Sequence, residues 1–226
     1  MTDAADQTTP NRAPRSEPSA SARRWLGKVL HVGVHIGALL PLLWLFVLIP
    51  QGGLGGDPVK ELIHYLGIGT LRLLMLTLLI APLARYLSFP QLNLLRRPLG
   101  LWCFAWATLH LTVWATLDLG LTWSLIGEEI VKRTYILVGM LVWLILAALA
   151  VTSLPALMRA MGKRWKQLHG LIYPAVLLGC LHFWWSAKSG WIEPAIYLAL
   201  ALGLLLARPQ KVRRWLKSIA PQRRSR

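Results

Sequence analysis

Two apolar stretches that each contain histidine constrain the fold of this chain most strongly. Residues 99–117 read LGLWCFAWATLHLTVWATL and contain His110, and residues 168–185 read LHGLIYPAVLLGCLHFWW and contain His169 and His182. About 20 apolar residues cross the roughly 30 Å hydrocarbon core of a bilayer. An ionisable ring inside such a span is costly and points to a functional site. Because imidazole is a common axial ligand of haem iron, the two stretches predict membrane helices that hold a haem.

The placement of the charges favours a membrane protein over a nucleic-acid-binding one. The chain has 226 residues, of which 55% are hydrophobic, and a net charge of +16. A basic chain can bind nucleic acid, but here the charges lie between and beyond long apolar runs, so we expect no nucleic-acid partner. Cys103 and Cys180 lie inside apolar runs and without a CxxC motif, which favours small packing residues over a zinc or covalent haem site.

The apolar runs predict an all-α polytopic membrane protein, a six-transmembrane-helix bundle with haem held between helices. No internal repeat of the kind found in transporters is evident. A polar segment at residues 1–24 is expected to be a disordered cytoplasmic N-terminus, residues 25–208 the transmembrane domain, and residues 209–226 a basic cytoplasmic tail. The expected helices cover residues 27–49, 63–87, 98–117, 134–154, 168–187 and, shortest of all, 194–207.

The basic residues also predict the orientation of the bundle. Of the 25 lysines and arginines, 20 fall in the N-terminal segment, the loops after the second and fourth helices, and the tail. The other side carries four, and Arg72 lies inside the second helix. Because cytoplasmic loops are enriched in lysine and arginine, both termini are expected to face the cytoplasm in a multi-pass protein.

His110 and His182 are expected to lie at one depth. At about 1.5 Å per residue, they lie roughly 18 and 21 Å from the cytoplasmic ends of their helices. Two imidazoles at one level on different helices suit bis-histidine ligation of a haem. The alternative is a polar contact that joins two helices.

The cytoplasmic half predicts a second, incomplete site. His169 lies 13 residues before His182, and the corresponding position before His110 is Arg97. With Arg96, these side chains suit a phosphate or carboxylate, although basic residues at this edge also serve topology. His35 could face the same site. Arg72 needs a counter-charge inside the membrane, which a haem propionate would supply; snorkelling to the outer surface is the alternative.

The remaining histidines have weaker claims to a cofactor. His31 is expected near the cytoplasmic edge and His64 at the outer interface. No nucleophile–base set, glycine-rich phosphate loop or HExxH motif occurs, so no catalytic residue is predicted.

Four segments resemble the YedZ/MsrQ family, namely GGLGGDPVK, TLLIAPLARY, RRPLGLWCFAWATLHL and GKRWKQLHGLIYPAV. The resemblance covers about residues 25 to 210. It implies the haem-binding membrane subunit of the bacterial periplasmic methionine-sulfoxide reductase system MsrPQ, within a ferric-reductase-like transmembrane group that includes the NADPH oxidases.

The resemblance implies haem b as cofactor, with FMN also associated with the family. His110, His169 and His182 match the haem-associated histidines, and Arg97 occupies the fourth position, where the wider group has histidine. Electrons would pass from a cytoplasmic flavin reductase or the quinone pool, across the inner membrane, to the molybdopterin catalytic subunit MsrP, which repairs oxidised periplasmic proteins. The chain itself would be an electron-transfer subunit rather than the catalytic one.

Two other functions stay open on the sequence alone. One is a direct ferric or quinone reductase of the cytochrome b type. The other, from a different class, is a small proton-coupled transporter that uses histidine relays.

Overall fold

A computed structural model describes residues 20–187 and 190–219, and these residues form helices joined by short turns. Of the segment 1–24 that was predicted to be disordered, residues 1–19 lie outside the described residues, and residues 20–24 are instead helical, at the start of the first helix. The long helices are α1 (Ala20–Leu48), α2 (Pro58–Tyr86), α3 (Arg96–Val113), α5 (Thr134–Val151), α8 (Ile172–Ser186) and α9 (Ile192–Leu206). Shorter helices are η1 (Pro90–Leu95), the π-helical turn η2 (Trp114–Asp118), α4 (Trp123–Lys132), α6 (Pro155–Met161), α7 (Lys163–His169) and α10 (Pro209–Ile219).

The all-α polytopic class is confirmed. Five helical stretches are long and apolar enough to cross a membrane: Trp25–Leu48, Pro58–Tyr86, Pro90–Asp118, Thr134–Val151 and Lys163–Ser186. The expected sixth helix is α9, which has only 15 residues and meets α10 at a bend of 84°. The described residues therefore contain five such helices, or six if this bent pair makes one span.

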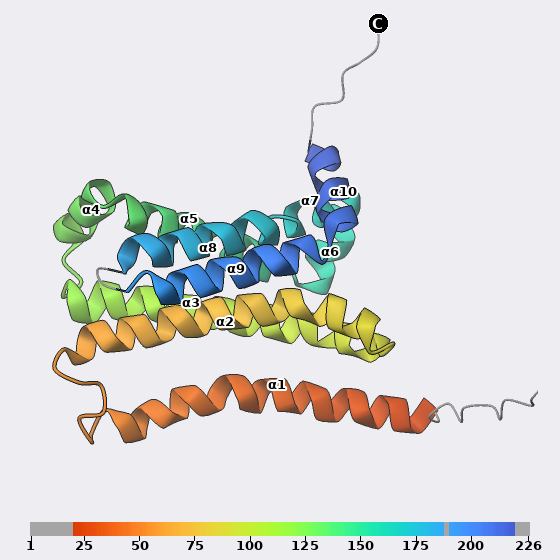
Figure 1. Ribbon diagram of the computed structural model, residues 1–226, viewed down its shortest axis with the longest axis horizontal. Coiled ribbons are helices and arrows are strands. Elements are labelled where there is room, and N and C mark those ends of the chain that lie inside the picture. The colour runs from red at the N-terminus through yellow and green to blue at the C-terminus, as the bar shows by residue number, and fades with distance from the viewer. Residues whose placement is uncertain (1–19, 188–189, 220–226) are drawn as a thin grey trace, which may run out of the picture.

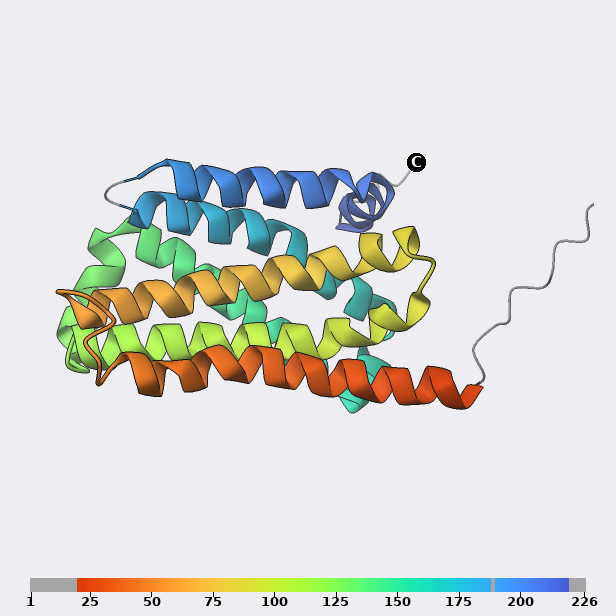
Figure 2. The ribbon, with the colours of Figure 1, turned by 60° about the horizontal axis from the view of Figure 1, so that its bottom comes forward.

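The long helices form a bundle of two antiparallel hairpins with two further helices beside them (Figures 1 and 2). The most extensive contacts are between α2 and α3 and between α5 and α8, and α3 also packs on α5. α9 lies along α8, and α1 lies on the outside of the first hairpin, along α3. This arrangement brings α3 and α8, which carry the predicted ligands, into the middle of the bundle.

The buried side chains between these helices are almost all apolar. Cys103 and Cys180 are buried and free, and each lies within sulfur hydrogen-bond distance of a backbone carbonyl, that of Thr70 and that of Tyr197. Both cysteines thus pack as small buried residues. By contrast, α1 exposes an apolar face that includes Ile36, Leu40 and Phe46, as a helix in contact with lipid does.

Four short α-helices fall where the sequence predicted loops or tail, namely α4, α6, α7 and α10. The prediction relied on apolar length, and these helices have only 7 to 11 residues, which in α4, α7 and α10 are rich in charge. On α4, ion pairs one turn apart join Glu128 to Lys132 and Glu129 to Arg133, and such pairs stabilise a surface helix. The charges that make α4 too polar for a membrane span therefore also stabilise it as a helix.

The two ends of the bundle differ in charge. We call the end with α4 and the 49–57 turn the acidic end, and the end with the 87–95 turn, α6, α7 and α10 the basic end (Figure 1). The six acidic residues of the described part all lie at or near the acidic end: Asp57, Glu61, Asp118, Glu128, Glu129 and Glu193. By the positive-inside tendency, the basic end is the expected cytoplasmic one.

Candidate haem site

His110 is held by a backbone carbonyl of the neighbouring helix. Its Nδ1 lies 2.9 Å from the carbonyl oxygen of Ile63 on α2. Gly67, one turn further along α2, faces the ring, and a Cβ placed there would lie 3.1 Å from Cε1 of His110. The ring therefore packs closely against the backbone of Gly67, so that a side chain there would require a small shift of the ring or the helix.

His182 is held in the same way in the second hairpin. Its Nδ1 lies 2.7 Å from the carbonyl oxygen of Tyr135 on α5. Gly139, again one turn further along, faces the ring, and a Cβ there would lie 2.7 Å from Cε1. A carbonyl acceptor at Nδ1 fixes the N–H on that nitrogen and leaves the lone pair on Nε2, the arrangement usual for a metal-binding histidine.

The two settings are equivalent in sequence as well as in structure. Each histidine follows its carbonyl partner by 47 residues. The set Ile63, Gly67 and His110 corresponds to Tyr135, Gly139 and His182 with a constant offset of 72 residues. The correspondence lies in the spacing of three positions and in the two glycines rather than in similar sequence.

The two rings approach each other between α3 and α8. Their centroids are 6.2 Å apart and their planes are nearly perpendicular, at 87°. Two opposed imidazoles that bind one metal ion at about 2 Å have centroids about 6 Å apart. Both side chains are partly buried, and neither Nε2 has a recorded hydrogen bond among the described residues. The predicted depth match therefore corresponds to a close approach, and the donors fit a bis-histidine haem.

His169 lies apart from this pair, at the basic end. It ends α7, stacks on Trp165 with ring centroids 4.0 Å apart, and places Nε2 3.0 Å from Oγ1 of Thr152. The indole N–H of Trp165 also donates to the Thr152 carbonyl, at 2.9 Å. Unlike His110 and His182, His169 has its Nε2 engaged, so a ligand would have to replace Thr152 or use Nδ1.

The structure does not bring His169, Arg96 and Arg97 into one contact cluster among the described residues. Arg96 is partly buried and interacts electrostatically with Tyr173 and Arg208, whereas Arg97 is exposed. The three side chains share the basic end of the bundle. Arg96 nevertheless has partners that the sequence did not indicate.

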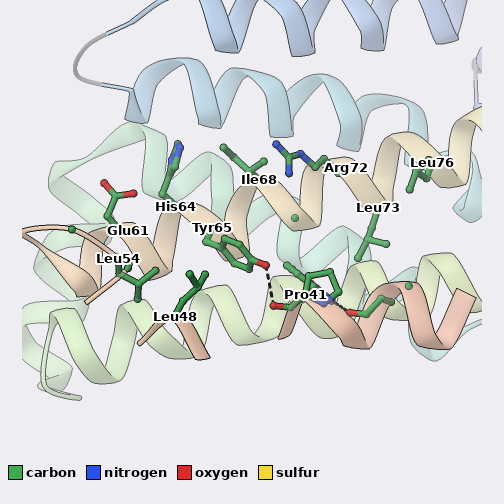
Figure 3. Close-up of a pocket in the computed structure, with 16 residues that line it drawn as sticks. Pro41, Leu48, Leu54, Glu61, His64, Tyr65, Ile68, Arg72, Leu73 and Leu76 are labelled. Carbon is green, nitrogen blue, oxygen red and sulfur yellow. Dashed lines mark hydrogen bonds between the residues drawn. The ribbon is translucent and has the colours of Figure 1, made fainter. Parts of the chain in front are cut away.

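Arg72 lines a cavity between α1 and α2, beside α9. The cavity has a volume of about 620 Å³, and Pro41, His64 and Tyr65 also line it (Figure 3). Nε of Arg72 donates to the hydroxyl of Tyr197 on α9, at 2.7 Å. This phenol is a neutral acceptor, so the contact provides a hydrogen bond but no counter-charge.

The other histidines occupy the outside of the bundle. His35 accepts a hydrogen bond at Nδ1 from the indole of Trp102 on α3, at 2.9 Å, and packs near His31. The structure thus places His35 against α3 rather than beside His169. His64 is exposed, lies near Phe183 and is an electrostatic neighbour of His110. Among the described residues, no group of three or more His, Cys, Asp or Glu side chains could hold a metal ion by itself.

Comparison with known proteins agrees with this geometry. Residues 66–180 match the family described as "Ferric reductase like transmembrane component". The chain is 48% identical over 187 residues to proteins from Salmonella paratyphi B, Salmonella newport and Salmonella heidelberg, a match that covers 82% of this chain and 94% of each relative. Each is named protein-methionine-sulfoxide reductase heme-binding subunit MsrQ.

The chain belongs to the MsrQ family. The resemblance inferred from four sequence segments is thereby confirmed. The ferric-reductase-like match begins in α2 and ends in α8, so it includes Gly67, Gly139 and His110 but stops two residues before His182. Gly67 and Gly139 were missed from the sequence, where the common 43-residue spacing from each glycine to its histidine was the available signal.

Proposed function

We propose that this chain is a haem b membrane electron-transfer subunit in which His110 and His182 are the two axial ligands. The observation that supports this most directly is the convergence of two equivalent histidines, each with Nδ1 at a backbone carbonyl. The relatives' name, heme-binding subunit, supports the same cofactor.

The chain's own residues prepare this site. The carbonyls of Ile63 and Tyr135 select the tautomer and fix the angle of each ring. Gly67 and Gly139 provide the space in which the rings lie. Haem supplies reversible one-electron chemistry when bound. The helices around it exclude water, since the nearest core side chains, such as Trp106, Ala107 and Phe183, are buried and apolar.

Electron entry belongs at the basic end under this proposal. The donor is a cytoplasmic flavin reductase or the quinone pool, and His169, Arg96 and Arg97 serve the entry site. His169 is a candidate ligand for a second haem or a neighbour of a bound flavin such as FMN, with Thr152 as its resting partner. The chain lies in the bacterial inner membrane with both termini in the cytoplasm.

The acceptor is the periplasmic catalytic subunit MsrP, at the acidic end. The relatives' name supports a place in a protein-methionine-sulfoxide reductase system. In this proposal the chain relays electrons for the repair of oxidised periplasmic proteins and does no bond chemistry itself. The closest competing function is a direct ferric or quinone reductase, which the ferric-reductase-like family match favours.

Reoxidation of the reduced protein distinguishes these functions. The purified protein in liposomes is reduced chemically, excess reductant is removed, and absorbance is followed after addition of MsrP with methionine sulfoxide or of ferric citrate. We expect fast reoxidation with MsrP and methionine sulfoxide together and not with ferric citrate. Fast reoxidation by ferric citrate alone would favour the direct reductase, and a protein without haem would favour the transporter.

A further inference from the structure

Arg208 is a buried cation without a counter-charge among the described residues. It follows α9, is only 3% exposed, and has the neutral hydroxyl of Tyr173 as a neighbour but no carboxylate of the described part. A guanidinium has five N–H donors and stays charged. A buried cation without a counter-charge is unfavourable, so this position favours an anion from outside the described residues.

Other cations surround Arg208. A cavity of about 220 Å³ is lined by Arg85 from the end of α2, by Arg208, and by Gln210, Lys211 and Arg214 of α10. Arg96 acts on Arg208 electrostatically from the start of α3. We call Arg85, Arg208, Lys211 and Arg214 the basic pocket. With a water molecule occupying about 30 Å³, the cavity has room for a phosphate group and part of the molecule that carries it.

No carboxylate of the described part neutralises this pocket. All six described acidic residues lie at or near the opposite end of the bundle, and the ion pairs seen in the described part involve Asp57, Glu128 and Glu129 there. Arg85 and Arg96 both act on Arg208 as like charges. Cations at this density repel one another, so an anion from outside the chain is the natural counter-charge.

The helix that completes the pocket is fixed in place. The indole of Trp215 on α10 packs over Gly170, where a Cβ would lie 1.7 Å from Cδ1 of the indole. Its N–H donates to the carbonyl of Gln167 at 2.8 Å, and the Gln167 side chain donates to the carbonyl of Ser218 at 2.9 Å. Lys211 and Arg214 therefore face Arg85 from a helix anchored on α7.

We propose that the basic pocket binds a phosphate group at the basic end of the bundle. Phosphate oxygens accept several charge-assisted hydrogen bonds at once, and a guanidinium fork matches two of them. The group has two possible sources with the same chemistry. One is the headgroup of an anionic phospholipid, since α10 is charged and bends across the end of the bundle. The other is the phosphate of a flavin mononucleotide. The inference does not depend on the haem ligands.

The test measures binding of two phosphate probes by the full-length protein in detergent. Flavin fluorescence compares FMN with riboflavin, and native mass spectrometry counts bound phosphatidylglycerol after delipidation. The variants are Arg85→Gln, at an exposed position of the pocket, and Arg208→Gln, at its buried position. Arg213→Gln is the matched control, because it removes one charge from α10 without lining the cavity.

We expect one of the two probes to bind about tenfold more weakly to Arg85→Gln and Arg208→Gln and normally to Arg213→Gln. Loss of FMN but not riboflavin binding identifies a flavin phosphate, and loss of retained phosphatidylglycerol identifies a lipid headgroup. Equal effects of Arg85→Gln and Arg213→Gln on both probes would overturn the proposal. Circular dichroism and haem content report folding separately, so failure of the haem proposal and failure of this one are distinguishable.

Discussion

Replacement of Gly139 by alanine is expected to displace the ring of His182 and weaken haem binding while leaving α5 intact. The new Cβ would lie 2.7 Å from Cε1 and 2.8 Å from Nδ1 of His182. Ordinary contact begins near 3.4 Å, so the ring or the helix has to move by about 0.7 Å. Binding constellations tolerate displacements of about 0.5 Å. This displacement exceeds that limit. It also disturbs Nδ1 of His182, whose hydrogen bond to the Tyr135 carbonyl holds the ring in place.

The size of the effect follows from that hydrogen bond. Its loss costs about 1 kcal/mol, which corresponds to about a fivefold weaker hold on haem. The backbone is not the cause, because alanine is preferred to glycine in a helix by about 0.5–1 kcal/mol. Gly67→Ala is expected to have a smaller effect, since its Cβ would lie 3.1 Å from His110 and needs a shift of only about 0.3 Å.

The assay is the haem-to-protein ratio at limiting haem, measured for each variant after the same purification. Gly100→Ala is the matched control, because it lies on α3 and a Cβ there meets nothing within 4 Å. We expect haem occupancy to fall in the order wild type and Gly100→Ala, then Gly67→Ala, then Gly139→Ala. Equal haem occupancy in Gly139→Ala and Gly100→Ala would refute the argument that close packing against glycine positions the ligand.

Two further predictions concern the basic end and the topology. The double variant Arg96→Gln with Arg97→Gln is expected to keep the haem of His110 and His182. Its reduction by the cytoplasmic donor is expected to be slower, and the amount of bound flavin lower, than in the wild type. A wild-type reduction rate together with wild-type flavin content would mean that the two arginines only determine topology. Reporter fusions at the C-terminus and within residues 118–133 are expected to report opposite sides of the membrane, cytoplasmic and periplasmic respectively, and a C-terminus outside the cell would contradict the orientation and the depths derived from it.

The sequence was sufficient to predict five of the six expected spans and to place His110 and His182 at one level, while their role as haem ligands stays a prediction. Apolar length and the position of charges depend on local composition, and the common depth of His110 and His182 follows from counting residues along two helices. The close approach of their rings, at 6.2 Å, is what that count led us to expect.

The partners of these residues could not be predicted, because they depend on how helices pack. A backbone carbonyl such as that of Ile63 carries no sequence signal, and Gly67 or Gly139 is indistinguishable from other helical glycines until a ring is seen against it. Tyr197, the partner of Arg72, lies 125 residues further along the chain. Trp102, the partner of His35, lies 67 residues further along. Charge-rich α10 was read as tail because its docking depends on Trp215 meeting Gly170 across the bundle end.

The most direct test of the account is the reduced-minus-oxidised visible spectrum of the purified protein, calibrated by pyridine haemochromogen for haem per chain. We predict a b-type signal in the wild type that His110→Ala and His182→Ala each lose, while His31→Ala and His64→Ala keep haem content near that of the wild type. Absence of a b-type signal from the folded wild-type protein, or equal loss of haem in His64→Ala and His110→Ala, would contradict the assignment of His110 and His182 as the paired ligands.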